Sequence, residues 1–453
     1  MKSTCALKKF QIEGLFGKYN VDLEFKNNIN IYVGENGIGK TTILNCIYYT
    51  LSGKFKKLVD INFDKIYFEI GNISASITKR DIDTYYKVLD NNYFIKDRII
   101  EDIKFIKSVP GIKDTYKTID ELRSSLPSIE TTKILDRLEH FIPSESLISL
   151  INRNNIMEIQ HRLSSLDTHN ILYFPTYRRI EEDLFSILKP SSYDIEEKRA
   201  SRRIKSISED IENIADNTSL IQFGMHDVED SINKTLQEIT DLAASGFREF
   251  TEKLFLRIFD EAPSAPPLKY TTEEKKNLSI IVERLNLKIS QEKRKNVLEY
   301  IKNSKLNDEY KKFFIKNLLD IYNSQKAYDS ALRLFTETCN AYFENKKYIY
   351  NEKDISLNIQ SSDGFPIQLS QLSSGEKQIV SLFSKIFLSN QQRQNIVLFD
   401  EPELSLSIFW QKRLLVDIAN SNRCDFLIAV THSPFIFENE LRDYTSSLQD
   451  FIR

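Results

Sequence analysis

Four segments of this chain carry hydrophobic patterns that predict the core of an α/β unit. Apolar side chains alternate along residues 29–33, as in a strand, and recur at helical spacing along residues 43–47. Residues 396–399 and 426–430 are apolar without interruption. Such runs predict strands that are buried on both faces, as in a parallel sheet.

Weaker patterns predict further elements. Residues 63–77 predict a hairpin that turns at Gly71 and Asn72, and residues 95–168 have the polar, mainly helical pattern of an insertion. Residues 171–181 predict a strand that ends at a proline and a basic pair. Residues 355–364 predict short strands joined by a turn.

The helical period dominates from about residue 181 to 345. Three prolines within residues 260–267 must break it, and a second break is expected near residue 307. We expect an arm that goes out and returns. Helices of ~30–40 residues would give it a reach of ~45–60 Å. The periodic apolar positions are Val228, Ile232, Leu236, Ile239 and Ala243.

Composition narrows the class of protein. The chain has 453 residues, 41% of them hydrophobic, with 29 Phe, 21 Tyr and a net charge of −3. This excludes disorder as the main state and argues against a surface covered by nucleic acid. The four cysteines lack zinc-ligand spacing, and no segment resembles a signal peptide or a membrane span. We therefore expect a soluble cytoplasmic protein without a membrane partner.

The glycines give the first indication of chemistry. Three of the 12 glycines lie within residues 34–39, in the pattern G-x-x-x-x-G-K-T between a predicted strand and a predicted helix. Such a loop directs backbone N–H groups at a phosphate, with Lys40 bridging the β- and γ-phosphates and Thr41 ligating Mg²⁺. The predicted nucleotide-binding residues of this loop are Gly34, Glu35, Asn36, Gly37, Ile38, Gly39, Lys40, Thr41 and Thr42.

Polar residues follow both buried runs. Asp400 is placed to hold Mg²⁺ with Thr41, and Glu401 to polarise an attacking water, although an ordinary acidic turn would also fit. The second run ends at His432, and an isolated histidine is more often structural.

Residues 372–378, with the sequence LSSGEKQ, predict the start of an amphipathic helix. Ser373 and Glu376 have the spacing of a capping box, and Ile379, Leu382 and Phe383 follow on one face. Ser373 is thereby placed at a helix N-terminus, where free N–H groups attract an anion.

Four motifs of this chain resemble those of ABC-type ATPases and follow one another in the same order. They are the glycine-rich loop, residues 372–378, the acidic pair and His432. The resemblance implies a P-loop head, with a mixed sheet and flanking helices, that hydrolyses ATP with Mg²⁺. His432 would be the switch histidine, which contacts the γ-phosphate and acts with Glu401 in catalysis. Residues 403–407 occupy the D-loop position, with Ser407 where many relatives have histidine.

The resemblance also implies a homo-oligomer, either a dimer or a higher ring. The signature of one subunit would complete the loop of another, so that Ser373, Ser374, Gly375 and Glu376 would bind nucleotide held by a neighbour. Residues 1–180 would form an ATPase lobe with the phosphate loop and a helical insertion. Residues 181–345 would form the arm, and residues 346–453 would form a second lobe with the signature, the acidic pair and the switch histidine.

Residues 172–181, 223–229 and 372–383 are similar to the ATPases of bacterial anti-phage systems, most like the PARIS family AriA and next the Septu and retron family PtuA. This implies a scaffold or sensor that holds a separately encoded nuclease and releases it on sensing a phage trigger protein. The nuclease would be TOPRIM-like in the PARIS type and HNH in the Septu type. An SMC- or RecF-like DNA-repair ATPase is the alternative.

Two features concern the partners. Residues 198–205 carry five basic side chains and residues 293–295 three more, which could contact DNA, RNA or an acidic partner. The neighbouring Glu and Asp residues balance this charge and favour a solvated helix face instead. Because 21 residues follow His432, we expect no effector domain there and no nuclease activity in the chain alone.

Overall fold

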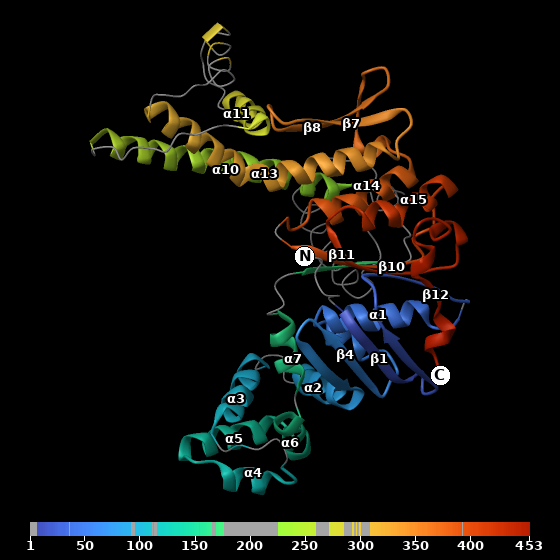
Figure 1. Cartoon of the computed structure of the whole chain (residues 1–453). Coiled ribbons are helices and arrows are strands. Elements are labelled where there is room, and N and C mark those ends of the chain that lie inside the picture. Colours follow the sequence, from blue (N-terminus) through green and yellow to red (C-terminus); the bar gives the residue numbers. More distant parts are fainter. Residues whose placement is uncertain are drawn as a thin grey trace, which may run out of the picture.

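The computed structural model describes residues 7–35, 37–91, 96–110, 112, 116–153, 155–164, 169–175, 225–259, 271–284, 292, 293, 296, 299, 309–391 and 393–453. Several sequence predictions lie wholly or partly outside these residues, among them the end of the strand predicted at residues 171–181 and the basic residues 294 and 295. Others concern Asn36, the basic residues 198–205, the prolines of residues 260–267 and the break near residue 307. Figure 1 shows three sheets flanked by helices, with an arm of long helices extending to one side.

The central sheet has five strands in the order β12-β3-β11-β10-β6, and every pair of neighbours is parallel. Because the strands are parallel, their carboxyl ends meet at one edge, which is where α/β sheets bind ligands. The loop after β3, the acidic pair at the end of β10 and the histidine after β11 all lie at this edge. The strands are β12 (Thr445–Ser447), β3 (Ile29–Val33), β11 (Cys424–Thr431), β10 (Gln394–Asp400) and β6 (His169–Phe174).

The uninterrupted apolar runs are explained by two separate cores. Side chains alternate across a strand, and Ile396 and Leu398 of β10 pack in one core while Val397 and Phe399 pack in the other. The first core contains α1 (Lys40–Leu51), and the second contains α14 (Ser374–Phe387) and α15 (Ile408–Ala419). The helices α1 and α14 therefore lie on opposite faces of the sheet (Figure 1).

An antiparallel sheet in the order β2-β1-β4-β5 completes the first core. The hairpin predicted in residues 63–77 is confirmed as β4 and β5, and the helices predicted in residues 95–168 are confirmed as well. The strands are β1 (Leu7–Leu15), β2 (Tyr19–Glu24), β4 (Lys65–Ile70) and β5 (Ile73–Thr78). The helices on this side are α2 (Lys79–Asn91), α3 (Lys96–Ser108), α4 (Ile119–Ser125), α5 (Ile129–Phe141), α6 (Ser144–Arg153) and α7 (Asn155–Ser164).

The arm consists of α10 (His226–Phe259) and α13 (Glu309–Asn340), which lie side by side (Figure 1). A third core joins them to α11 (Thr272–Arg284), around Phe250, Ile281 and Tyr322. The 34 residues of α10 span about 50 Å at about 1.5 Å per residue, which agrees with the expected reach. The small sheet β7 (Lys346–Asn351), β8 (Ser356–Ser361) and β9 (Pro366–Ile367) follows the arm.

The predicted fold class is confirmed as an α/β fold with flanking helices and an inserted helical arm. The boundary predicted at residue 345 falls between α13 and β7, but the division into three domains stays a prediction. In the part of the chain that the structure describes, no helix combines the length and the apolar character needed to cross a bilayer.

Candidate functional site

The glycine-rich loop connects β3 to α1, as the sequence predicts. Gly37 and Gly39 have φ angles of 87° and 94°, in the left-handed region that favours glycine. Gly39 precedes α1 and makes no side-chain capping bond, and the first turn of α1 carries no acidic residue. The N-terminus of α1 is therefore available to an anion.

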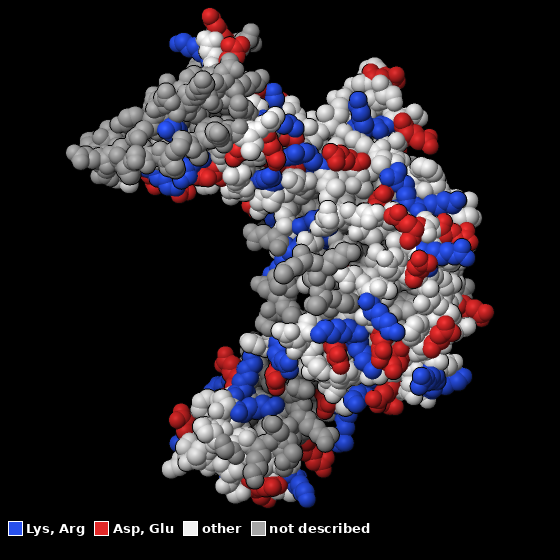
Figure 2. All heavy atoms as spheres, in the orientation of Figure 1, with Lys and Arg blue, Asp and Glu red and all other residues white. Residues whose placement is uncertain are grey.

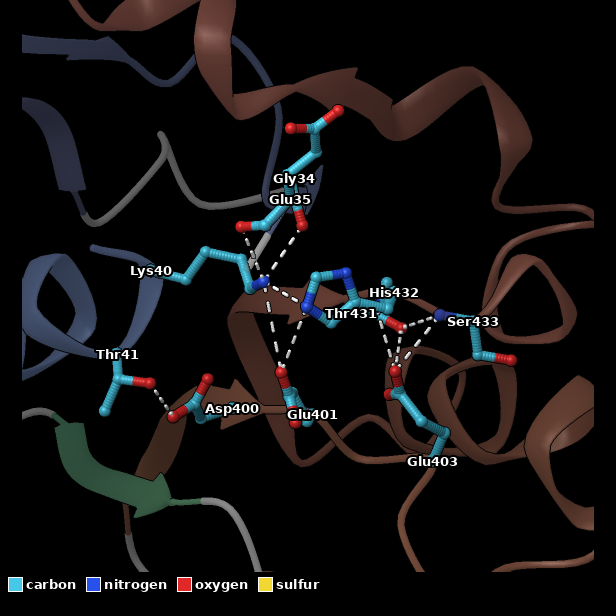
Figure 3. Close-up of polar contacts among 10 residues, drawn as sticks. All are labelled: Gly34, Glu35, Lys40, Thr41, Asp400, Glu401, Glu403, Thr431, His432 and Ser433. Atoms are coloured by element: carbon cyan, nitrogen blue, oxygen red, sulfur yellow. Dashed lines mark hydrogen bonds and ion pairs between the residues drawn. The ribbon is translucent and has the colours of Figure 1, made fainter. Parts of the chain in front are cut away.

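Lys40 is the first residue of α1, and its side chain turns back into the loop (Figure 3). Its Nζ atom donates to the carbonyl oxygens of Gly34, at 2.9 Å, and Glu35, at 3.1 Å, and contacts the imidazole of His432. Burial lowers the pKa of Lys40, although the carboxylates near it, above all Glu401, act in the opposite direction. The ammonium group is thus held by loop groups that a bound phosphate can replace.

Thr41 and Asp400 bring two oxygen ligands together beside Lys40. The Thr41 hydroxyl donates to Oδ2 of Asp400 over 2.7 Å, which connects the first turn of α1 to the end of β10 (Figure 3). A hydroxyl and a carboxylate are the kinds of oxygen that Mg²⁺ prefers. The donor set of these two residues therefore fits a magnesium ion.

Glu401 follows β10 in a left-handed conformation with a φ of 52°, which non-glycine residues adopt at a cost. Its Oε1 atom lies 3.2 Å from Nε2 of His432 and 3.9 Å from Nζ of Lys40. The side chain is about one-quarter exposed. The structure therefore gathers the expected base, the expected switch histidine and the loop lysine around one point (Figure 3).

Glu403 joins this group through the segment that carries His432. Its Oε1 atom accepts hydrogen bonds from the Thr431 hydroxyl at 2.8 Å, the His432 N–H at 2.9 Å and the Ser433 N–H at 3.1 Å. The sequence places Glu403 at the start of the D-loop segment but does not indicate these contacts, because its partners lie 28 to 30 residues further along the chain. The signals that the sequence offers are this D-loop position and the place of Glu403 directly after Pro402.

Phe16 is a second residue that the sequence pattern does not mark. It lies in the turn between β1 and β2 with a φ of 57°, and 46% of it is exposed. Its N–H donates to the carbonyl of Asn62 at 2.9 Å, and a side chain at Gly39 would bring its Cβ within 3.0 Å of the Phe16 ring. An exposed aromatic ring thus lies against the phosphate loop.

The predicted capping box at the start of α14 is confirmed. The Ser373 N–H donates to Oε2 of Glu376 at 2.7 Å, and Lys346 of β7 forms a 2.8 Å ion pair with the same carboxylate. Burial acts to raise the pKa of Glu376, but the bonds from Lys346 and Ser373 outweigh it and the pKa is lowered. Gly375 packs against Trp410, at a place where a Cβ would lie 2.9 Å from that ring.

Within one chain the signature does not join the phosphate loop. The residues that contact Ser373, Gly375 and Glu376 belong to β7, α14 and the segment from residue 405 to 410. The helix α14 also lies on the opposite face of the central sheet from α1. The structure therefore brings Lys40, Thr41, Asp400, Glu401 and His432 together and leaves the signature apart from them.

A family model described as "AAA domain, putative AbiEii toxin, Type IV TA system" matches residues 99–438, about three-quarters of the chain. The chain belongs to this family. Membership identifies it as an ATP-binding ATPase of the AAA class. The matched range contains the signature, the acidic pair and His432, whereas the phosphate loop of this AAA chain precedes it.

Three similar proteins can be compared with this AAA chain. The DNA replication and repair protein RecF of Actinobacillus succinogenes is 41% identical over 69 residues, which are 14% of this chain; the chain spans about a fifth (19%) of the length of RecF. An Smc head domain with an extended coiled coil, from Pyrococcus furiosus and bound to the C-terminal domain of ScpA, is 17% identical, with a TM-score of 0.35 and coverage of 97% of this chain and 95% of that one. An SmcHead bound to the C-winged helix domain of ScpA is 13% identical, with a TM-score of 0.34 and coverage of 95% and 90%.

The described residues of this AAA chain show no separation of charge on the face drawn in Figure 2. There, Lys and Arg side chains of the described residues are interspersed with Asp and Glu over the head and the helices around it. A broad basic surface is the usual footprint of nucleic-acid binding. On this face the described residues therefore do not supply one.

Proposed function

We propose that this chain is an ABC-type ATPase that binds ATP with Mg²⁺ and hydrolyses it in a site completed by a second copy. The observation that carries the proposal is the meeting of Lys40, Glu401 and His432 at the carboxyl edge of the parallel sheet, with Oε1 of Glu401 3.2 Å from His432 and 3.9 Å from Lys40. The hydrogen-bonded pair of Thr41 and Asp400 lies beside them.

Each group has a role that follows from its chemistry. Lys40 and the first N–H groups of α1 bind the β- and γ-phosphates, in place of the carbonyl oxygens that now accept from Lys40. Thr41 and Asp400 would hold the Mg²⁺, which when bound supplies positive charge to the phosphate oxygens. Glu401 orients a water and accepts its proton, and His432 donates to a γ-phosphate oxygen.

The position of the signature supports a shared site. The Ser373 N–H and the Glu376 N–H are engaged in the capping box, and the amides of Ser374 and Gly375 take no part in it. These amides and the positive end of α14 form a potential anion-binding site. The phosphate loop of the same chain lies apart from this site and cannot place its nucleotide there. A neighbouring copy would bring its phosphate loop and its ATP to this end of α14.

Subunits with complementary lesions are expected to restore activity when mixed. Lys40→Ala disables the loop and Ser373→Arg blocks the signature, so each variant alone has only defective sites. A mixed dimer has one intact site, and random pairing predicts recovery of about a quarter of wild-type turnover. ATP hydrolysis is measured after subunit exchange, which is followed with two affinity tags.

In a matched control, the Lys40→Ala chain is mixed with a chain that carries both Ser373→Arg and Lys40→Ala. No intact site can then form, so turnover stays at the level of the separate variants. Proven exchange without recovery in the first mixture would contradict a site made by two chains, while wild-type turnover would still support the ATPase itself.

In the cell we propose a two-component anti-phage role, in which the ATPase holds a separately encoded nuclease and releases it when a phage trigger protein is sensed. The family description, which names a toxin and a toxin–antitoxin system, supports a defence context. A TOPRIM-like nuclease, as in PARIS systems, is the first candidate, and an HNH nuclease, as in Septu systems, is the second.

Co-expression with the neighbouring gene tests this role. The chain is expected to co-purify with that gene's product, and Lys40→Ala or Glu401→Gln to block signalling to it. Expressed alone, the chain is expected to leave plasmid DNA and cellular RNA intact. Metal-dependent cleavage by the purified chain that persists in Lys40→Ala would contradict a separate effector.

The match to RecF over 69 residues supports a second candidate, a DNA-repair ATPase. Tight, ATP-dependent binding of duplex DNA by the chain alone would favour that function. On the face drawn in Figure 2, the interspersed charges of the described residues favour the first.

A further inference from the structure

The carboxylate of Glu403 holds three consecutive residues of the segment that ends in His432. One oxygen, Oε1, accepts from the hydroxyl of Thr431 and from the backbone N–H groups of His432 and Ser433, at 2.8 to 3.1 Å. Thr431 is the last residue of β11, so the contact begins where the strand ends. Figure 3 shows the three donors converging on Glu403 beside the imidazole.

The loop that carries Glu403 is itself fixed by side chains of two helices. Gln411 of α15 donates to the carbonyl oxygens of Glu403, at 3.3 Å, and Leu406, at 2.9 Å. The same amide accepts from the Ser433 hydroxyl at 2.7 Å. On the other side, Gln378 of the signature helix α14 donates to the Leu404 carbonyl at 3.1 Å. Residues 403–406 are thus bound both to α14 and to the histidine segment.

We propose that Glu403 is a positioning residue for ATP hydrolysis, which sets the place of the His432 imidazole relative to Glu401 and the phosphate loop. The proposal rests on the ATPase function proposed above. The hydrogen bonds of Glu403 go to the backbone and hydroxyl of residues 431–433, so it acts through His432. Its negative charge also acts on Lys40, whose pKa it raises slightly against the effect of burial. Through Gln378 it also connects the signature helix to the histidine of the same chain.

The expected loss of turnover in Glu403→Ala follows from the groups that the hydrogen bonds of Glu403 hold in place. Without Glu403, the Thr431 hydroxyl and the His432 N–H lose their acceptor, while the Ser433 N–H keeps the Thr431 hydroxyl oxygen at 3.0 Å. The segment after β11 is then held only from the Ser433 side, and the His432 imidazole gains freedom to move. The His432 Nε2 atom lies 3.2 Å from Glu401 in the present arrangement. Misplacing a catalytic group by about 1 Å costs on the order of 100-fold in rate, so a 10- to 100-fold loss of kcat is the expected order for Glu403→Ala, with little change in KM.

Hydrogen exchange of the full chain tests the contact without any nucleotide. In Glu403→Ala the amide of His432 is expected to exchange faster, and that of Ser433 to a smaller extent because it keeps the Thr431 hydroxyl as an acceptor. Peptides from β10 and the interior of β11 keep their protection. Glu403→Gln retains an acceptor oxygen and is expected to keep the two amides protected. Unchanged protection in Glu403→Ala would overturn the proposal even if the chain proved not to be an ATPase.

A double-mutant cycle tests the route through His432. If Glu403 acts only by placing the imidazole, the variant with both Glu403→Ala and His432→Ala has the kcat of His432→Ala alone, within about twofold. Multiplying effects would overturn the proposal and leave the ATPase assignment intact. Glu438→Ala, an exposed carboxylate on the same stretch of chain, controls for loss of charge and is expected to keep wild-type turnover.

The glutamine variant also separates position from folding. If amides throughout the chain exchange faster in Glu403→Ala, that variant is unfolding and the Glu403→Gln variant is used instead. A turnover of Glu403→Gln within about threefold of wild type then supports the role of Glu403 as a hydrogen-bond acceptor. Loss of turnover in Glu403→Gln with the two amides still protected would overturn it, because the histidine segment would then be in place and inactive.

Discussion

Replacing Lys40 by alanine is expected to abolish ATP hydrolysis and to weaken ATP binding by at least about 100-fold. The ammonium group already donates to two carbonyl oxygens of the loop and is only 6% exposed, so it is in position for two phosphate oxygens. Two hydrogen bonds to a charged group, at about 1.5 kcal/mol each, correspond to a loss of about that size. Equilibrium binding of a fluorescent ATP analogue and phosphate release measure the two effects.

Lys353→Ala is the matched control, because it removes a lysine that pairs on the surface with Glu283, on α11. It is expected to bind and hydrolyse ATP as the wild type does. A thermal melt of both variants separates loss of binding from loss of folding, because Lys40 also bonds the loop in the absence of ligand. Near-wild-type turnover in Lys40→Ala would contradict the ATPase assignment.

The sequence predicts those parts of the site whose residues are neighbours in the chain. The glycine-rich loop is one segment between a strand and a helix, and its geometry depends on Gly37, Gly39 and the start of α1. The capping box of Ser373 and Glu376 spans four residues. The apolar runs before Asp400 and His432 predict buried parallel strands, and parallel strands bring their carboxyl ends to one edge.

Contacts between distant loops leave no such pattern. Glu403 is an acidic residue after a proline, and nothing local indicates that it accepts from a segment about 30 residues later. Phe16 belongs to a turn whose approach to Gly39 depends on how the antiparallel sheet packs on α1. The ion pair of Lys346 and Glu376 likewise joins β7, the strand that follows the arm, to α14.

The separation of the signature from the loop shows a different limit. The resemblance of the motifs to those of ABC-type ATPases implies that the signature of one chain completes the loop of another, but no pattern of residues in the sequence separates the two motifs within one chain. The two cores of the central sheet decide the arrangement within the chain, since α1 packs in one and α14 in the other. The second copy is therefore required by the proposed chemistry and not by any local pattern of residues.

Replacing Glu401 by glutamine is expected to separate binding from hydrolysis. The amide keeps the size of the side chain and its left-handed backbone, but it cannot take a proton from water, so kcat falls by about 100- to 10,000-fold. ATP affinity is expected to stay the same or to rise, because a carboxylate 3.9 Å from the Lys40 ammonium no longer repels the phosphates. Single-turnover hydrolysis and equilibrium binding measure the two quantities.

Slow hydrolysis also gives this variant a second expected property. With ATP held in the site, two copies should stay joined through the signature, so Glu401→Gln should elute as a dimer or larger ring when ATP is present and as a smaller species without it. Adding Ser373→Arg to the same chain should abolish the ATP-dependent species and leave binding to the loop. A Glu401→Gln chain that neither binds ATP nor assembles would show that Glu401 shapes the loop after β10 and is not the base.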